Sequence, residues 1–372
     1  MTRNKSSVLF FSAVRKMARW QRTAWRLAPH ALFKDLMTPS SERPAAAGKV
    51  ARKRPPAGRP PRDAGPDEAD AAPFAGTWKA RVYRTPPTPG AWPVRLSYFV
   101  YAPPGLRKGC PVLVMLHGCE QTARDFAVGT RMHRIADREG VLLVYPQQSR
   151  RGQQNRCWHW YQPDAAHGYA EADAIAGIAA AAATDSQADP SRIYIAGLSA
   201  GASMAALVAL RHPDLFAALG MHSGAALGSA RNAGQGLRVM RHGVDAAPEQ
   251  AMAALVAERA GFPGMPAIIV QGEDDTVVDK RNGWQLFEQL AWANGMDVDD
   301  SAVAQEKSAG NARHHRRTDA PTRRGPVVSV CTVPGLGHAW SGGDGRVRFH
   351  ARQGPNASLL MWRFFKGRRR AG

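Results

Sequence analysis

Gly197-Leu198-Ser199-Ala200-Gly201 decides the fold prediction, because it stands between the apolar run 193–195 and a helical pattern at 200–212. Small residues two positions before and after a serine let a strand turn sharply into a helix without a backbone clash. Such a turn lifts the serine hydroxyl above a sheet and places free helix N–H groups beneath a reacting carbonyl. The stretch predicts a nucleophilic Ser199; the alternative is a glycine-rich turn without a chemical role.

Short apolar runs recur on both sides of this turn and alternate with longer helical patterns. Fully apolar strands separated by helices are typical of a parallel sheet that is covered on both faces. Apolar runs lie at 112–116, 141–145, 193–195, 267–270 and 327–333, an alternating run at 94–102, and helical patterns at 121–139, 170–184, 200–212, 281–294 and 356–367. The sequence therefore predicts an α/β domain over residues 74–372, with a mostly parallel sheet between helices.

A base and an acid follow the serine in the chain. His338 lies in a glycine-rich loop, 334–343, after the last apolar run. An imidazole can take the serine proton, and a carboxylate can fix its tautomer. The order serine, acid, histidine fits a nucleophile placed on such a turn. Three acids follow the run at 267–270 and leave the choice open: Asp274, Asp275 and Asp279.

Two backbone amides are candidates for stabilising the negative oxygen that forms during acyl transfer. Ala200 directly follows the serine, and Cys119 lies in the loop after the run 112–116, which are the two places where such donors are expected. We interpret His212 and His222 as helix-end or core histidines. Trp158 and Trp340 are candidates for a substrate wall, with packing in the core as the alternative.

The chain of 372 residues carries a formal net charge of +20. A basic protein is drawn to polyanions such as nucleic acid, anionic lipid or acidic polymers. The sequence holds neither zinc-finger spacing nor an RNP-type motif nor a P-loop lysine, so we expect no specific nucleic-acid partner. Four cysteines are too few for a disulfide-stapled scaffold, and no apolar run approaches the ~20 residues that span a bilayer.

Much of this charge lies in a basic N-terminal extension, residues 1–73. Residues 1–72 hold 15 Lys or Arg and 6 Asp or Glu, a net of +9. Residues 15–37 fit an amphipathic helix, which predicts binding to an anionic surface or packing on the catalytic domain. Residues 40–73 are rich in Pro, Ala, Gly and Arg, which is typical of a disordered linker. The short apolar stretch 8–14 is interrupted by Arg15, so we expect no cleavable signal peptide.

Residues 296–326 interrupt the α/β pattern. They are polar and lack aliphatic periodicity, so we expect a functional loop or a disordered insertion. The pair His314-His315 lacks carboxylate or thiolate partners at ligand spacing, which favours a solvated loop over a metal site. The expected chemistry requires neither a metal nor an organic cofactor.

Several stretches together resemble the family of poly(3-hydroxybutyrate) depolymerase-like esterases, in the α/β-hydrolase superfamily, which includes feruloyl and acetylxylan esterases. The matching stretches are 117–123 with 125–126, 145–147, 157–158 with 160, 197–201, 216–224, 272 with 275, 337–343 and 354–355. The resemblance covers about residues 90–366. Three departures leave the chemistry intact and the substrate open: His159 where Asn is commoner, Glu273 where Asp is commoner, and the insertion 296–326 next to the expected active-site face.

The resemblance implies catalytic Ser199, Asp275 and His338, and it favours Asp275 because that acid lies three residues after a glycine that ends a strand. It also implies that Cys119 and Cys157 form a disulfide; two buried thiols are the alternative. Esters of hydroxyalkanoates, polymeric or oligomeric, are the implied substrates. Family members are commonly secreted, which implies an extracellular protein, whereas the N-terminus favours a cytoplasmic one.

Two other functions remain open at this stage. The same residues serve feruloyl or acetylxylan esterases, serine peptidases and thioesterases, because a fold does not determine its substrate. The extension 1–73 instead favours a basic protein that binds polymer granules, membranes or nucleic acid, with the hydrolase domain secondary.

Overall fold

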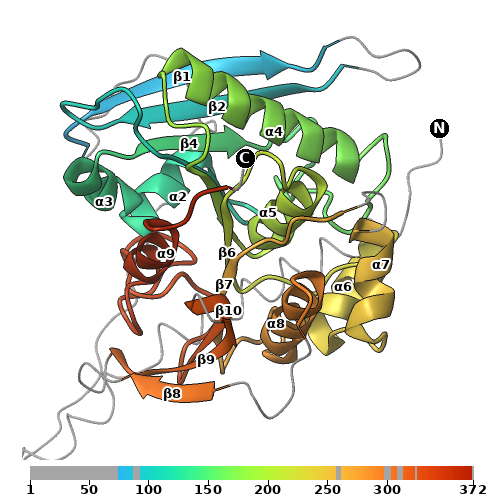
Figure 1. The fold of residues 1–372 in the computed structure, drawn as a ribbon. Coiled ribbons are helices and arrows are strands. Elements are labelled where there is room, and N and C mark those ends of the chain that lie inside the picture. The colour runs from blue at the N-terminus through green and yellow to red at the C-terminus, as the bar shows by residue number, and fades with distance from the viewer. Residues whose placement is uncertain are drawn as a thin grey trace, which may run out of the picture. The chain divides into compact units, whose positions relative to one another are not determined.

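The computed structural model describes residues 74–86, 93–256, 261–296, 303–307, 313–322 and 325–370. The helix expected at 15–37 and the linker expected at 40–73 lie outside these residues. In the described part of the chain, ten strands form one sheet in the order β1-β2-β4-β3-β5-β6-β7-β10-β9-β8 (Figure 1). The strands are β1 (Thr77–Arg84), β2 (Arg95–Ala102), β3 (Val112–Leu116), β4 (Leu142–Gln147), β5 (Ile193–Leu198), β6 (Ala218–His222), β7 (Ala267–Gly272), β8 (Val303–Lys307), β9 (His315–Thr322) and β10 (Gly325–Val333).

The centre of the sheet is parallel and its two edges are antiparallel. Strands β4, β3, β5, β6, β7 and β10 run in one direction, and all residues of β3 and β5 are buried. β1 and β2 form one antiparallel edge, and β9 and β8 form the other. The continuous apolar runs therefore mark strands that are covered on both faces, as expected for a parallel sheet.

Helices cover both faces of this sheet (Figure 1). One face carries α2 (Ala123–Thr130), α3 (Met132–Glu139) and α9 (Ala357–Phe365); the other carries α4 (Gly168–Asp185), α5 (Ala200–Arg211) and α8 (Arg281–Ala293), with α6 (Ala233–His242) and α7 (Pro248–Val256) beside them. Every residue of α5 before Arg211 is buried. This burial explains why α5, which carries the serine at its start, is apolar all round.

The single helix expected at 121–139 is two helices. α2 begins with a capping box, in which the Thr122 side chain and the Asp125 side chain exchange hydrogen bonds with each other's backbone amides. It ends at Thr130, and the next residue, Arg131, has a left-handed φ of 55° that turns the chain into α3. The left-handed residue stops the first helix because an α-helix cannot continue through positive φ.

The expectation of a structureless insertion at 296–326 is wrong over the residues that the structure describes. Residues 303–307 and 315–322 form β8 and β9, which pair antiparallel with each other and with β10. His315 is buried at the start of β9, rather than solvated. The segment has no aliphatic period because it builds an edge of the sheet, where polar side chains are tolerated on open faces.

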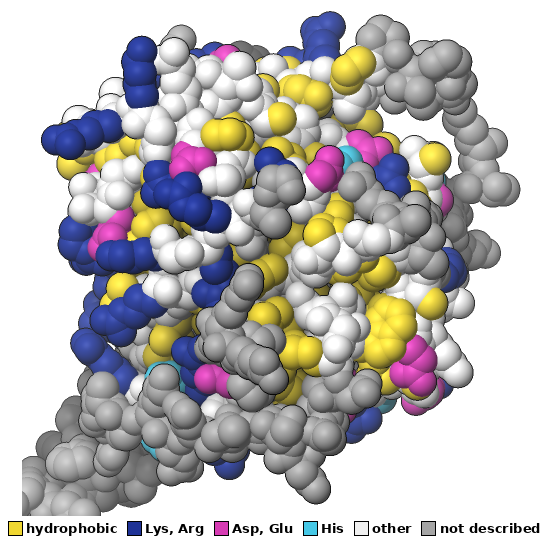
Figure 2. Space-filling view, viewed as in Figure 1, with side chains coloured by type: hydrophobic (Ala, Val, Ile, Leu, Met, Phe, Trp, Pro, Cys, Tyr) yellow, Lys and Arg dark blue, Asp and Glu magenta, His cyan; other side chains and the backbone are white. Residues whose placement is uncertain are grey.

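Among the described helices, none combines the length and the hydropathy that crossing a membrane requires. Lys and Arg side chains stand out on the side of the molecule where α3 and α9 lie (Figure 2). Since residues 1–72 hold +9 of the net charge of +20, the rest of the chain is basic as well.

Candidate active site

Ser199 stands on a strained turn between β5 and α5. Its φ of 57° and ψ of −123° fall outside the regions that non-glycine residues ordinarily adopt. A methyl group on Gly197 would lie 2.3 Å from the Gly201 carbonyl oxygen, and one on Gly201 would lie 2.3 Å from the Leu116 carbonyl oxygen. Both positions therefore exclude a side chain, and the turn that the pentapeptide predicts is the one observed.

His338 and Asp275 meet at the same edge of the sheet. The His338 Nδ1 atom lies 2.8 Å from the Asp275 Oδ2 atom. Ser199, Asp275 and His338 are 8%, 6% and 7% exposed, respectively. The bond assigns the proton of the imidazole to Nδ1, which leaves Nε2 as the basic nitrogen.

Asp275 is held as a carboxylate by its surroundings. Its Oδ1 atom accepts hydrogen bonds from the amides of Val277 and Val278, each at 2.9 Å. Burial alone would raise the pKa of Asp275, but the His338 ring and these two amides outweigh it and hold the pKa below its ordinary value. The residue is therefore suited to orient an imidazole and to stabilise an imidazolium.

The two other acids that the sequence left open are placed elsewhere. Asp274 is exposed, and Asp279 pairs with Arg281 at 2.9 Å. The loop that carries the acids is tied to the loop of His338, because the Asp274 amide donates to the Leu336 carbonyl at 3.1 Å. Gly272 makes this approach possible, since a methyl group there would lie 2.2 Å from the same carbonyl oxygen.

The loop 117–121 passes beside Ser199. A methyl group on Gly118 would lie 3.5 Å from the Ser199 Cβ atom. The amides that flank Cys119 are engaged, with the Gly118 amide donating to the Gln121 side chain at 2.8 Å and the Glu120 amide to the Asn155 carbonyl at 2.6 Å. The Ala200 amide opens α5, where helix amides have no partner in the helix itself.

A disulfide joins Cys119 to Cys157. It links the loop beside Ser199 to the aromatic segment 157–161, in parallel with the Glu120–Asn155 backbone bond. Cys110 and Cys331 are free and buried.

His117 anchors this loop from below. Its Nε2 atom accepts from the Gln148 amide at 3.1 Å, so its Nδ1 atom carries the proton and donates to the Gly118 carbonyl at 2.8 Å. Burial lowers the pKa of His117 to about 4, so the ring is neutral at pH 7.

His222 anchors the loop of His338 in the same way. Its Nε2 atom accepts from the Ser341 amide at 3.1 Å, and its ring stacks on Trp340 with centroids 5.2 Å apart. Burial, and then the nearby His338, lower the pKa of His222 to about 3. The interpretation of His222 as a core histidine is confirmed, and its partners show that it supports the site. His212 ends α5 and bonds to Asp173 at 2.8 Å.

The prediction that Trp158 and Trp340 form a substrate wall is wrong for this structure. Both side chains are fully buried. The Trp158 indole N–H donates to the His117 carbonyl at 2.9 Å, and that of Trp340 to the Ser358 hydroxyl at 3.1 Å. The two tryptophans pack behind the loops of the site, because a ring beside a catalytic loop can stabilise it without facing the substrate.

Phe349 is a site residue that the sequence did not indicate. Its φ of 63° is left-handed, its half-buried ring lies 6.3 Å from the His338 ring, edge to face, and the Arg348 guanidinium lies 4.3 Å above it. Arg348 also pairs with Glu120 at 2.5 Å, across to the loop of Cys119. In the sequence, a single phenylalanine gives no local indication of this role. In the structure, the left-handed backbone at such a bulky residue indicates it.

No cluster of three or more His, Cys, Asp or Glu with metal-binding geometry occurs among the residues that the structure describes.

Comparisons with known proteins identify the family of the chain. The family model described as "Esterase PHB depolymerase" matches residues 96–317. Poly(3-hydroxyalkanoate) depolymerase C of Paucimonas lemoignei is 30% identical over 255 residues, which cover 67% of this chain and 59% of that protein. Feruloyl esterase B of Thermothelomyces thermophilus is 32% identical over 143 residues, or 38% of this chain and 48% of its own length.

Among solved structures, an acetyl xylan esterase from Aspergillus awamori is similar with a TM-score of 0.55 and 21% identity, covering 65% of this chain and 89% of its own. That likeness confirms the α/β-hydrolase fold that the sequence predicts. The chain spans between about half and three fifths of the length of the two curated relatives named above.

Proposed function

The chain belongs to the esterase PHB depolymerase family, and on that premise we propose that it hydrolyses carboxylic esters through an acyl-enzyme on Ser199. The catalytic domain of the proposal is residues 74–372, and the basic residues 1–73 precede it. The single observation that carries the proposal is the 2.8 Å bond between His338 and Asp275, at the edge of the sheet where the strained Ser199 stands.

In the proposed mechanism, the Ser199 Oγ atom attacks the ester carbonyl carbon while the His338 Nε2 atom takes the hydroxyl proton. The amides of Ala200 and Cys119 donate to the oxygen that becomes negative. The tetrahedral intermediate then expels the alcohol, which receives its proton from His338. Water attacks the acyl-serine, His338 takes a proton from that water and returns it to Ser199, and the carboxylic acid leaves. Asp275 keeps Nδ1 protonated throughout.

We propose poly- or oligo-hydroxyalkanoate esters as the substrate class. The similarity to a poly(3-hydroxyalkanoate) depolymerase supports this choice over the shorter matches to feruloyl esterases. Phe349 replaces Trp158 and Trp340 as our candidate for contact with the substrate, because its ring is partly exposed beside His338.

The test is labelling with a fluorophosphonate, read by intact mass and peptide mapping, together with hydrolysis of a short acyl p-nitrophenyl ester. One adduct on Ser199 with turnover supports the mechanism. Ser199→Ala should lose the adduct and lower kcat by on the order of 10⁴-fold or more, with an unchanged melting temperature.

Ser203→Ala is the matched control, because Ser203 lies one turn further in the same helix and its hydroxyl bonds to the backbone of Ala225. It should keep both label and turnover. A folded Ser199→Ala protein with full activity would overturn the mechanism, whereas activity on p-nitrophenyl esters without activity on hydroxybutyrate oligomers would overturn only the substrate.

A further inference from the structure

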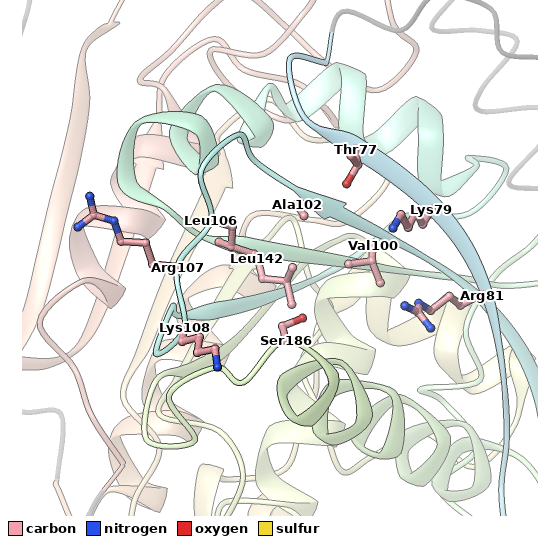
Figure 3. Close-up of a pocket in the computed structure, with 10 residues that line it drawn as sticks. All are labelled: Thr77, Lys79, Arg81, Val100, Ala102, Leu106, Arg107, Lys108, Leu142 and Ser186. Carbon is pink, nitrogen blue, oxygen red and sulfur yellow. The ribbon is translucent and has the colours of Figure 1, made fainter.

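A hollow of about 240 Å³ lies on the flank of the domain, between β1, the end of β2 and the residue that follows α4 (Figure 3). Its lining comes from four separated stretches: Thr77, Lys79 and Arg81; Val100 and Ala102; Leu106, Arg107 and Lys108; Leu142 and Ser186. Thr77, Lys79 and Arg81 alternate along β1, so their side chains lie on the same face of the strand.

The hollow lies at the edge of the sheet where the parallel strands begin, whereas Ser199 lies at the edge where they end. Leu142 opens β4, and Ala102 closes the antiparallel β2, so both lie at the edge where the parallel strands begin. Ser199 follows the other end of β5. A ligand in the hollow is therefore separate from the reaction.

Three cationic groups converge on this hollow. The ends of Lys79, Arg81 and Lys108 point toward the space between them, whereas Arg107 points away (Figure 3). Within the described part of the chain, the ion pairs involve neither Lys79 nor Lys108. Two uncompensated ammonium groups at one small concavity favour an anion.

One negatively charged side chain, that of Asp185, lies close to the hollow and opposes its positive charge. Asp185 is 3.6 Å from Arg81, and the carbonyl end of α4 adds a partial negative charge. Arg81 neutralises Asp185, and about half a charge at the helix end does not cancel the two lysines. The balance at the hollow remains positive.

The floor of the hollow is apolar. Val100, Ala102, Leu106 and Leu142 line it, and Leu142 is only 1% exposed. The hydroxyls of Thr77 and Ser186 are the uncharged polar groups of the lining. A group that carried charge alone would leave the apolar floor unused, whereas an acid with a short hydrocarbon chain would cover it.

We propose that this hollow binds a small carboxylate with a short apolar chain, with its charge between Lys79 and Lys108 and its chain on Val100 and Leu106. The volume of about 240 Å³ is below the range of roughly 300–1,000 Å³ that drug-sized ligands occupy, which limits the ligand to a few carbons. Ester hydrolysis releases acids of this class, but the binding proposal stands independently of the hydrolase activity.

The experiment is a ligand-observed NMR titration of the full chain, carrying Ser199→Ala, with hexanoate. We expect saturable binding that weakens as salt is added. Lys79→Gln/Lys108→Gln should raise the dissociation constant about five- to tenfold, because each exposed charge contributes modestly. Arg134→Gln/Arg363→Gln is the matched control: it removes two exposed charges elsewhere on the domain and should leave the constant within about twofold.

Three further ligands and one variant separate the alternatives. Hexanol lacks the negative charge of hexanoate, acetate lacks its hydrocarbon chain, and inorganic phosphate shows whether the hollow binds any anion. Hexanoate should bind more tightly than all three. Val100→Thr keeps the shape of the floor and should weaken hexanoate while leaving acetate unchanged.

Equal weakening by the two double variants would mean non-specific attraction and overturn the proposal, as would unchanged hexanoate binding in Lys79→Gln/Lys108→Gln. Phosphate binding as tight as hexanoate would overturn the assignment to a carboxylate with an apolar chain.

Discussion

The edge of the sheet where the parallel strands end and the edge where they begin carry their ionisable groups in different ways. At the edge of Ser199, His117, His222 and Asp275 are buried, and each is bonded to a backbone amide of a loop that it supports. At the opposite edge, Lys79 and Lys108 face solvent around a hollow. Buried groups determine the shape of the first edge, because removing one leaves an unsatisfied partner. Exposed charges determine only what the second edge attracts.

The largest effect is expected at the acid of the first edge. Asp275→Asn should lower kcat/KM by about 10³- to 10⁴-fold, because an amide no longer holds the proton on His338 Nδ1. Asp274→Asn, one residue earlier and exposed, should change it by less than about twofold. Steady-state hydrolysis of a p-nitrophenyl ester measures both. Similar losses in the two variants would contradict the assignment of Asp275 as the partner of His338.

The next largest effect is a loss of folding stability at acidic pH, caused by the buried histidines. The pKa values of His117, His222 and His350 lie at about 4, 3 and 4, mainly because of burial. The unfolded chain therefore binds these protons first. The stabilisation is complete above pH 6.5 and is lost as the pH falls from 6.5 toward 4. The slope is at most about 1.4 kcal/mol per pH unit for each histidine.

Urea unfolding at pH 7.5 and pH 5.5 measures this loss, which should reach several kcal/mol by pH 5.5. His222→Gln keeps a side-chain acceptor for Ser341 and should reduce the slope by about the share of one histidine. A free energy of unfolding that stays level between these pH values would show that the rings are not held neutral.

At His159 we expect a smaller dependence of the free energy of unfolding on pH, with the opposite sign. Burial opposes the charge on this ring, but its bond to Glu171 at 2.6 Å outweighs burial and raises the pKa of His159. Its stabilisation is complete below pH 6.5 and is lost as the pH rises through the raised pKa. His159→Asn should therefore cost roughly 1 kcal/mol at pH 6 and less at pH 9, measured by urea midpoints. An equal cost at both pH values would mean that the ring is not charged.

The smallest effect is expected at the flank. Lys79→Gln/Lys108→Gln should change the free energy of unfolding by less than about 0.5 kcal/mol, because exposed charges contribute little to folding. Thermal and urea unfolding would measure it. A loss of 2 kcal/mol or more would show that these lysines support β1, and the contrast between the two edges would fail.

Strands and helices could be predicted from the sequence where a local pattern coincides with burial. The apolar runs at 112–116 and 267–270 became β3 and β7, and the helix expected at 200–212 became α5. Besides β8 and β9, two strands were not predicted: β1, whose residues are mostly exposed, and β6, which contains Gly220 and His222. A two-residue period requires one buried face, which an outer edge strand lacks, and glycine and histidine interrupt the continuous aliphatic run that indicated β3.

The amino-acid sequence by itself determined the turn at Ser199, because glycines at 197 and 201 permit the close backbone approach that this turn needs, and the flanking patterns specify a strand before it and a helix after it. The order of the strands, the burial of Trp158 and Trp340, the ring of Phe349 beside His338 and the hollow between Lys79 and Lys108 were decided by the tertiary structure. Each of these depends on segments far apart in the chain, and such contacts leave no local pattern from which they could be predicted.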